Sequence, residues 1–362
     1  MQLELRNVSK KVGREYHLSD ISLTFDSGTL NILLGPTLSG KTSLMRLMAG
    51  LDKPSSGTVH FSGRDVTGVP VQKRNAAMVY QQFINYPNLT VFENIASPLR
   101  IAKVSGPEIK KRVAKVASLL KLENMLTRSP NELSGGQQQR TALARALIKE
   151  ADLVLLDEPL ANLDYKLREE LREELPRIFA ETGSIFVYAT TEPSEALLLG
   201  GNTASLHQGQ ITQFGSTIEV FSRPQNLITA QTLSDPPLNI LPVTKLNNRM
   251  LFKAQVEIPL LGKLPQLPDD DYTIAFRPHH LYLHRPSDKA IAVKAKVAVT
   301  EITGSESYIH VDLAGIRWVL LASGIHHFDV HETIEIFMDP GKFYVFDSNN
   351  SLVVTPDAVA DV

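Results

Sequence analysis

One short stretch of the chain restricts its fold more than any other. The residues GPTLSGKTS match the pattern GxxxxGK[ST] through Gly35, Gly40, Lys41 and Thr42. The apolar run LNILLG before the motif predicts a buried strand, and GKTSLMRLMAG predicts a helix that ends near Gly50. A strand, a glycine-rich turn and a helix in this order form a loop that holds phosphate groups. The sequence therefore predicts a phosphate-binding loop.

The residue types in this loop suit a nucleotide with Mg²⁺. Backbone N–H groups and the helix N-terminus would hold a β-phosphate, Lys41 would reach the β- and γ-phosphate oxygens, and Thr42 would ligate Mg²⁺. The alternative is a glycine-rich turn without a ligand, and the strand and helix on either side argue against it. We expect the nucleotide to contact Gly35, Pro36, Thr37, Leu38, Ser39, Gly40, Lys41, Thr42 and Ser43.

A second motif, DLVLLDEP, is an apolar strand that ends in two carboxylates. Asp157 would bind Mg²⁺, and Glu158 would polarise the water that attacks the γ-phosphate. By itself, an acidic strand end is usually a solvated loop. Because this one follows a phosphate-binding loop along the chain, it favours phosphate hydrolysis.

The segment LSGGQQQR, from Leu133 to Arg140, predicts a second anion site. Ser134 suits the N-cap of the helix that follows, and the free N–H groups of that helix's first turn can bind an anion. The alternative is an ordinary capped helix, and the motif as a whole favours the anion site.

The order of elements predicts the fold class of the first two thirds of the chain. Short apolar runs such as DLVLLD and SIFVYA are typical of strands buried on both faces, and helical segments lie between them. This alternation predicts an α/β domain with a mostly parallel sheet, spanning residues 1–235. Residues from about 82 to 133 carry helical patterns without a buried strand and predict a helical subdomain.

After residue 235 the pattern changes to a period of two. Further short strand patterns follow at close spacing, so residues 236–362 predict a small all-β barrel or sandwich. Trp318 alternates with apolar neighbours and is expected in its core. The histidines of this part lack the spacing of metal ligands. One strand pattern, IAVKAKVAV, places on a single face Ile291, Val293, Ala295, Val297 and Val299.

Composition excludes several classes of function. The formal net charge is -2 and 21% of the residues are charged, which gives no basic field for nucleic acid. No cysteine is present, so zinc–thiolate sites and cysteine nucleophiles are excluded. The N-terminal residues MQLELRNVSK lack a signal-peptide pattern, and no apolar run approaches the roughly 20 residues that span a bilayer. Any membrane role is expected to involve another subunit.

Together these motifs resemble the nucleotide-binding subunit of an ATP-binding-cassette transporter, over essentially the whole chain. MVYQQFINYPNLTVFENIASPL resembles the Gln-loop region of carbohydrate importers, which makes Gln81 the expected contact to metal and water. LANLD resembles the D-loop, with Asp164 as its last residue. The residues similar to the family signature, which would contact the ATP of a partner subunit, are Ser134, Gly135, Gly136 and Gln137.

The C-terminal part resembles the same family. FRPHHLYL and VTEITGSESYIHVDL resemble the regulatory domain, built on an OB-like barrel, of importers of sugars, polyols and glycerol phosphate. The resemblance implies ATP and Mg²⁺ as ligands and two ATPase subunits that face each other head to tail. It also implies two transmembrane permease subunits, an extracytoplasmic solute-binding protein as an indirect partner, and a peripheral place at the cytoplasmic face of the inner membrane. No nucleic acid is expected as a partner, since fold resemblance alone does not imply it.

The stretch VYATTEPSEALL departs from the family pattern. Family members end this strand with Thr-His-Asp-Gln and continue with Glu-Ala, so Glu195 and Ala196 fix the register and Thr191 occupies the position of the switch histidine. Loss of one preorganised donor to the γ-phosphate costs on the order of 10² to 10³ in rate. The short, β-branched side chain of Thr191 could reach phosphate only through water or a shifted loop.

Two further positions differ from the family. Leu38 stands where many relatives have glycine, and a side chain there can constrain the approach of the backbone to phosphate. Val12 stands where an aromatic residue that stacks on adenine is usual. Tyr16 is the candidate substitute, and a surface or packing role is its alternative.

These features lead to the hypothesis that the chain pairs with a different ATPase subunit. Its own site would bind ATP and hydrolyse it weakly, while its signature completes a competent site on the partner. The alternatives are a homodimer without the switch histidine, a regulatory subunit that binds ATP without meaningful turnover, and a soluble cassette ATPase of DNA repair or translation. That soluble class usually carries two cassettes or a long coiled-coil insertion, and the sequence predicts neither. The expected solute is of the sugar, polyol or glycerol type.

Overall fold

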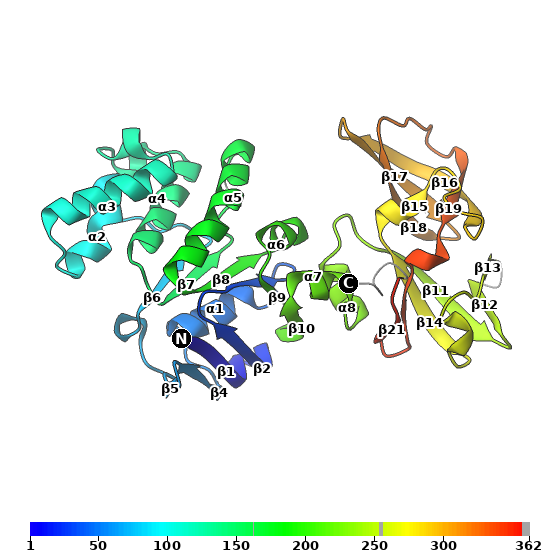
Figure 1. Cartoon of the computed structure of the whole chain (residues 1–362), viewed down its shortest axis with the longest axis horizontal. Coiled ribbons are helices and arrows are strands. Elements are labelled where there is room, and N and C mark those ends of the chain that lie inside the picture. Colours follow the sequence, from blue (N-terminus) through cyan, green and yellow to red (C-terminus); the bar gives the residue numbers. More distant parts are fainter. Residues whose placement is uncertain (162, 253–255, 357–362) are drawn as a thin grey trace. The chain divides into compact units, whose positions relative to one another are not determined.

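The computed structural model describes residues 1–161, 163–252 and 256–356 (Figure 1). The chain divides into two compact units, Met1–Ile218 and Glu219–Val362. Each unit contains a large buried cluster of apolar side chains of its own. None of the helices within the described residues is both long and apolar enough to cross a membrane.

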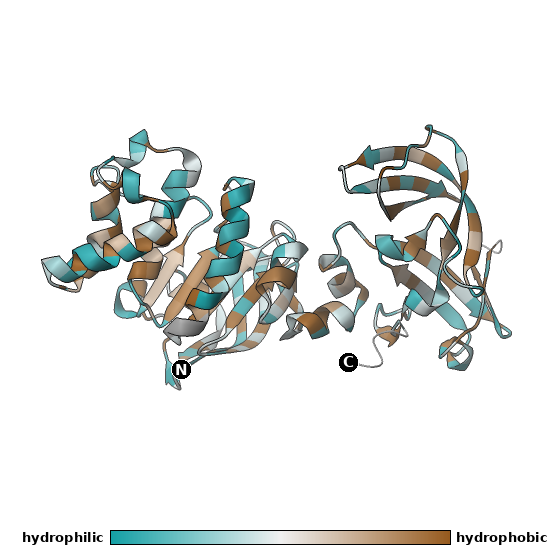
Figure 2. Ribbon diagram, turned by 45° about the horizontal axis from the view of Figure 1, so that its top comes forward, coloured by the Kyte–Doolittle hydropathy of each residue, from teal (hydrophilic) through white to brown (hydrophobic). Residues whose placement is uncertain are grey.

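A six-stranded sheet forms the centre of the first unit (Figure 1). Neighbouring strands β6, β7, β8, β3 and β9 run parallel, and β10 pairs with β9 in the antiparallel direction. Every residue of β3, β7 and β8 is buried, as expected for parallel strands covered on both faces (Figure 2). In spatial order from β10 to β6 the strands are Gln210–Ser216, Asn202–His207, Leu30–Leu34, Ile185–Thr190, Leu153–Asp157 and Ala76–Val79.

The N-terminal strands form a second, antiparallel sheet. Its order is β2 (Glu15–Asp26), β1 (Gln2–Val12), β4 (Ser56–Phe61) and β5 (Arg64–Asp65). The alternate residues Leu3 and Leu5 of β1 are buried, together with helix α1 (Lys41–Ala49) and the parallel sheet, in one apolar cluster. This cluster fixes α1, the helix that follows the glycine-rich loop.

The segment between β6 and β7 is helical. It contains α2 (Val91–Ile101), α3 (Gly106–Leu119) and α4 (Gly135–Ile148), and the described residues between the two strands include no strand. The fully buried side chain of Asn94 accepts a hydrogen bond from the Tyr86 N–H at 2.8 Å and donates to the carbonyl oxygens of Tyr86, Leu89 and Thr90. Asn94 thus ties the loop after β6 to α2. The remaining α-helices among the described residues are α5 (Tyr165–Thr182), α6 (Pro193–Leu199), α7 (Thr217–Ser222) and α8 (Leu227–Thr232).

The second unit consists mainly of two antiparallel sheets, which confirms the predicted all-β class. One has the order β13, β12, β11, β14, β20, β21, and the other has the order β15, β19, β16, β17, β18. In chain order from β11 to β21 the strands are Asn239–Leu246, Arg249–Phe252, Val256–Ile258, Asp270–Phe276, Leu281–Tyr282, Ile291–Ile302, Glu306–Leu313, Ile316–Ser323, Thr333–Met338, Tyr344–Phe346 and Leu352–Val354.

Strand β16 corrects one expectation about the facing of its side chains. Val293, Ala295 and Val297 are buried, whereas Val299 is 39% exposed. The pairing of β16 with β17 shifts between Val297 and Val299. Such an irregularity ends the alternation of faces, so Val299 does not continue the buried row.

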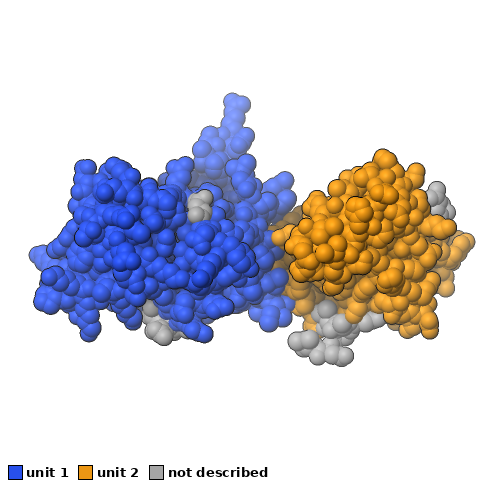
Figure 3. All heavy atoms as spheres, turned by 90° about the horizontal axis from the view of Figure 1, so that it is seen from above, with its two compact units in different colours: residues 1–218 blue, residues 219–362 orange. Residues whose placement is uncertain are grey.

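The two units meet in sequence between Ile218 and Glu219, so the boundary expected after residue 235 falls inside the second unit (Figure 3). The intervening segment packs on the C-terminal strands, since Ala230 belongs to an apolar cluster with Tyr344 and Phe346. The buried Arg277 guanidinium also lies 3.6 Å from the centre of the Phe221 ring. These contacts join residues that are far apart in the sequence, so no local sequence pattern predicts them.

Trp318 is fully buried in the second unit, as expected, and its Nε1–H donates to the Ile240 carbonyl oxygen at 3.0 Å. Trp318→Ala is expected to lower the free energy of unfolding by about 3–5 kcal/mol, because it leaves a cavity and an unpaired carbonyl. Trp318→Phe should cost less. Urea unfolding followed by circular dichroism checks this, and near-native midpoints for both variants would contradict it.

Candidate functional site

Parallel pairing places three functional segments at one edge of the central sheet. β3 leads into the glycine-rich loop, β7 ends at Asp157 and β8 ends at Thr190. Leu34 pairs with Thr190, and Asp157 pairs with Ala189, so the carboxyl ends of the three strands are nearly level. Side chains from distant parts of the sequence therefore meet beside the loop.

Two glycines give the loop its shape. A Cβ on Gly35 would lie 2.3 Å from the Leu206 carbonyl oxygen, and Gly40 has a φ of 108° directly before α1. Leu38 has a φ of 66°, in the left-handed region that favours glycine. Its side chain is 96% exposed and lines the open cavity over the loop, and its backbone conformation constrains the loop.

Lys41 is held inside the loop. Its Nζ donates to the carbonyl oxygens of Gly35 at 2.7 Å and Pro36 at 3.0 Å. Burial lowers the pKa of Lys41, and the nearby carboxylates of Glu158 and Asp157 oppose that shift. The buried Ser39 Oγ has no hydrogen-bond partner among the described residues. A cationic amine and an unsatisfied hydroxyl in a glycine-lined turn fit the oxygens of a phosphate chain.

Thr42 and Asp157 are joined by a direct hydrogen bond, in which Thr42 Oγ1 donates to Asp157 Oδ2 at 2.8 Å. Burial raises the pKa of the Asp157 carboxyl, while Thr42 and Lys41 lower it. Hydroxyl and carboxylate oxygens beside a phosphate-binding loop are ligands that Mg²⁺ prefers. This pair therefore fits a magnesium ion.

Gln81 and Glu158 form the second contact of this kind, with Gln81 Nε2 donating to Glu158 Oε2 at 2.9 Å. Burial raises the pKa of Glu158, and Asp157 adds to that shift. Glu158 also has a φ of 47°, uncommon for a residue with a side chain. The described residues contain no group of three or more His, Cys, Asp or Glu suited to a metal, so a magnesium ion here would also need oxygen ligands such as the Thr42 hydroxyl and the Gln81 amide.

A cavity of about 510 Å³ lies over the loop and is lined by Lys41, Thr42, Gln81 and Glu158. Tyr16 also lines it, 61% exposed, with Lys11 Nζ 5.3 Å from the centre of its ring. Four further lining residues have no motif that would select them from the sequence. They come from the start of β2 and the turn between β9 and β10, and they are Glu15, His17, Gln208 and Gly209.

Strand β8 ends at Thr190, and the residue that follows it, Thr191, does not take part in the site. Thr191 is exposed, does not line this cavity and forms no side-chain hydrogen bond with the described residues. The preceding Thr190 is buried and donates to Glu195 Oε2 at 2.7 Å. Tyr188 donates to the same oxygen at 3.0 Å, and Arg172 pairs with Glu195 Oε1 at 3.2 Å. A buried network missed by sequence reasoning therefore fixes the backbone at Thr191.

The signature segment opens α4 as a capped helix. Ser134 N–H donates to Gln137 Oε1 at 2.9 Å, and Ser134 Oγ accepts from the Gln137 N–H at 3.4 Å. Neither these two residues nor Gly135 and Gly136 line the cavity over Lys41. The structure thus separates the signature from the chain's own phosphate-binding loop.

Asp164 caps another helix. Its side chain accepts a hydrogen bond from the Leu167 N–H at 3.0 Å at the start of α5. Within the described chain, Asp164 does not line the cavity over the loop. Of the residues expected from the D-loop pattern, Asn162 lies outside the described residues.

Fold and site together define a P-loop ATPase with an appended all-β domain. The family model for the ABC transporter matches residues 18–161, and that for the TOBE domain matches residues 274–346. The chain is 34% identical to the trehalose/maltose import ATP-binding protein MalK of Thermococcus litoralis, over 97% of this chain and 99% of that protein. The chain belongs to the ABC transporter family, as one of its ATP-hydrolysing import ATP-binding proteins.

Other relatives agree with this placement. The sn-glycerol-3-phosphate import ATP-binding protein UgpC 3 of Rhizobium johnstonii is 33% identical over 96% of this chain and 97% of its own. The spermidine/putrescine import ATP-binding protein PotA of Haemophilus influenzae is 33% identical over 91% and 90%. Among solved structures, the dimeric post-hydrolysis state of the ATP-binding cassette MJ0796 bound to ADP and Pi matches with a TM-score of 0.55 and 31% identity, covering 59% of this chain and 98% of that one. The family resemblance and the α/β class expected from the sequence are confirmed.

The buried carboxyl of Asp157 makes stability depend on pH. Because its pKa is raised in the folded state, the folded protein binds this proton more tightly than the unfolded chain, and stability is lost as pH rises through the folded pKa. Asp157→Asn should therefore melt higher than the parent protein at pH 7, by about 2–4 °C, the shift that about 1 kcal/mol makes in a domain of this size.

This difference should shrink as the pH falls toward about 4, because the carboxyl is then increasingly protonated in the folded state and begins to be protonated in the unfolded chain. Thermal melts of the nucleotide-free protein from pH 4 to 8 measure it. The exposed Asp288→Asn serves as the control and should melt like the parent. A lower melting temperature for Asp157→Asn at pH 7 would show that attraction to Lys41 outweighs burial.

Proposed function

We propose that this chain is the ATP-hydrolysing subunit of an importer of a small polar solute of the sugar, polyol or glycerol type. The observation that carries the proposal is the meeting of Lys41 and Thr42 with Asp157, Gln81 and Glu158 at one sheet edge. Sugar and glycerol-phosphate import occur in the names of relatives that align over nearly the whole chain, and a polyamine importer is about equally similar. A transport assay with the neighbouring permease subunits, comparing maltose, glycerol, glycerol 3-phosphate and spermidine, tests the solute class. Uptake of spermidine alone would overturn it.

The roles of the site residues follow from their chemistry. Lys41, Ser39 and the loop N–H groups would bind the phosphates of ATP, and the exposed ring of Tyr16 would stack on the adenine. Mg²⁺ would be held by Thr42, Asp157 and Gln81 and would neutralise charge on the phosphates. Glu158, with its raised pKa, would accept a proton from the attacking water.

The partners in this proposal are those of a membrane transporter. The chain would work at the cytoplasmic face of the inner membrane, with two transmembrane permease subunits and, indirectly, an extracytoplasmic solute-binding protein. A second ATPase subunit would face it head to tail. That arrangement is supported by the signature, which lies outside the chain's own cavity and presents the capped N-terminus of α4.

The site of this chain would hydrolyse ATP slowly. A histidine at the end of β8 would give a donor to the γ-phosphate, and Thr191 is exposed and outside the cavity. One missing donor of this kind costs on the order of 10² to 10³ in rate. Because the phosphate-binding loop and both carboxylates are present, ATP binding itself would be retained.

The second ATPase subunit would then be non-identical and would carry the faster site, completed by the signature of this chain. The alternative is a homodimer in which two slow sites operate without the histidine. The two cases predict different effects on ATP turnover when this chain's P-loop and its signature are changed separately, so an experiment can distinguish them.

Restoring the donor tests the slow site directly. In the assembled transporter with the partner's P-loop lysine replaced, Thr191→His is expected to raise ATP turnover by about 10²-fold, because it supplies a donor to the developing charge. Thr191→Ala should leave turnover unchanged, since the hydroxyl has no partner in the described chain. A loss of turnover in Thr191→Ala would show that the threonine itself assists hydrolysis.

The pairing is tested by a matched pair of variants with opposite expectations. Lys41→Ala disables this chain's own site and should lower transporter turnover by no more than about twofold. Gly135→Asp disables the signature by charge repulsion and should lower turnover by about 10²-fold. A Cβ at Gly135 has only an ordinary contact, 3.8 Å from the Phe83 ring, so the fold should tolerate this change. Severe losses in both variants would favour the homodimer.

A further inference from the structure

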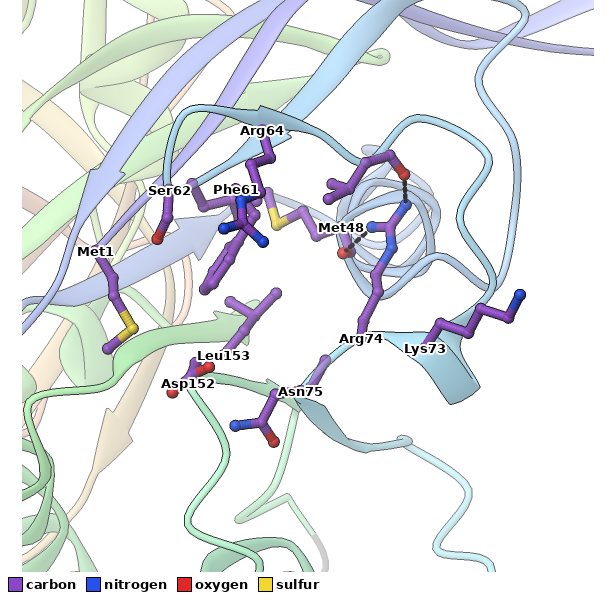
Figure 4. A pocket seen from close by; sticks show the side chains of 13 residues that line it. Met1, Met48, Phe61, Ser62, Arg64, Lys73, Arg74, Asn75, Asp152 and Leu153 are labelled. Atoms are coloured by element: carbon purple, nitrogen blue, oxygen red, sulfur yellow. Dashed lines mark hydrogen bonds between the residues drawn. The ribbon is translucent and has the colours of Figure 1, made fainter.

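A second cavity lies in the first unit and shares none of its lining residues with the cavity over the phosphate-binding loop. Its volume is about 370 Å³, within the range of small-molecule pockets. It lies where β6 and β7 begin, next to β4 and β5 of the antiparallel sheet (Figure 4). No residue of the proposed hydrolysis reaction contacts it.

One wall of this second cavity is apolar. The buried side chains of Leu3, Met48 and Leu153 line it, with the partly buried Phe61 and the exposed Met1 beside them. Apart from Met1, these residues come from β1, α1, β7 and β4, so the wall is held by four elements of one core. A ligand with an apolar body would remove this wall from water.

The lining also includes exposed basic residues. Arg64 and Lys73 are exposed and form no side-chain hydrogen bond or ion pair with residues in the described ranges. Figure 4 shows the Arg64 side chain extending from its strand over the cavity, and the Lys73 side chain extending from the margin away from Arg64. Asp152 is the acidic residue among those that line the cavity, so cations outnumber carboxylates there.

Arg74, the third basic residue that lines the cavity, binds backbone carbonyl oxygens. Its guanidinium donates to the carbonyl oxygens of Met48 at 2.7 Å and Val69 at 2.9 Å, and to that of Val66. Figure 4 shows it turned toward the end of α1. Arg74 is therefore already satisfied, which leaves Arg64 and Lys73 available for a ligand.

We propose that this cavity binds a small organic anion with an apolar body, of the size of a medium-chain carboxylate. The body would pack on Phe61 and Leu153, and the carboxylate would pair with Arg64, while the charge of Lys73 would add attraction from the margin. Charge complementarity and the apolar wall support this class, because neither a cation nor a fully polar ion would use both halves of the cavity.

A ligand in this cavity would change the affinity of the protein for nucleotide. The cavity contacts the end of α1 whose other end carries Lys41 and Thr42, and the start of β7 whose other end carries Asp157. β6, which begins in the cavity at Ala76, leads to Gln81 in the same way. A ligand that tightens these elements at one end would change their freedom at the other, and such coupling is reciprocal.

The probe for this site is sodium octanoate, titrated calorimetrically into the full chain with any tag at the C-terminus, because Met1 lines the cavity. Octanoate should bind about tenfold or more tightly than butyrate, which lacks most of the apolar body. The double variant Arg64→Glu and Lys73→Glu should weaken octanoate binding by about tenfold or more. Octylamine, with the same body and the opposite charge, should bind the parent more weakly than octanoate.

The matched control is Lys110→Glu with Lys111→Glu, the same change of charge at two exposed lysines of α3 outside the cavity. It should bind octanoate like the parent, and circular dichroism should show both double variants folded. Equal weakening by the control pair, or equal binding of octylamine, would overturn the site. Saturating ADP should change the octanoate affinity by about fivefold or more. An unchanged affinity would overturn the coupling to the nucleotide.

Discussion

The register of the parallel strands β3, β8 and β7 is the constraint on which the nucleotide site depends. Thr42 and Asp157 are 115 positions apart in sequence, and their side chains form a hydrogen bond of 2.8 Å because both follow strands whose carboxyl ends are level. A shift of one residue in a strand turns every side chain to the other face. Asp157 would then leave the site. The full burial of these strands makes such a shift costly, so the core specifies the geometry of a polar site that it does not line.

That geometry carries an electrostatic cost in the nucleotide-free protein. Burial raises the pKa of Asp157 and Glu158 and lowers that of Lys41, because the partial loss of water destabilises the charged form of each group. Hydrogen bonds offset part of this destabilisation. The lysine donates to backbone carbonyl oxygens, and the carboxylates accept from Thr42 and Gln81. Phosphate oxygens and a divalent cation supply the opposite charges. The site is therefore arranged to gain most from a ligand that brings both signs together, as a magnesium nucleotide does.

Local motifs allowed the sequence to predict the phosphate-binding loop and the acidic strand end, because each depends on a few consecutive residues. Contacts between distant segments left no such pattern. Glu195 served in the sequence only to set the register at Thr191, yet its carboxylate is buried between Tyr188, Thr190 and Arg172. The division of the chain near residue 218 depends on packing between Phe221 and Arg277, which are 56 positions apart. Such contacts become visible only once the sheets are assembled.

The hydrogen-bond network around Glu195 holds the backbone at Thr191. Burial and the Glu195 carboxylate raise the pKa of Tyr188, so its hydroxyl stays protonated and donates to Glu195. Thr190 donates to the same carboxylate and accepts from the Glu192 N–H at 3.0 Å, which fixes the backbone on both sides of residue 191. None of these bonds involves the Thr191 side chain. The hydrogen bonds that hold the end of β8 are thus formed without the Thr191 side chain. Loss of either Glu195 or Arg172 would leave the other charge buried without its partner, which is strongly destabilising. The network therefore holds the backbone on both sides of residue 191 independently of the side chain at that position.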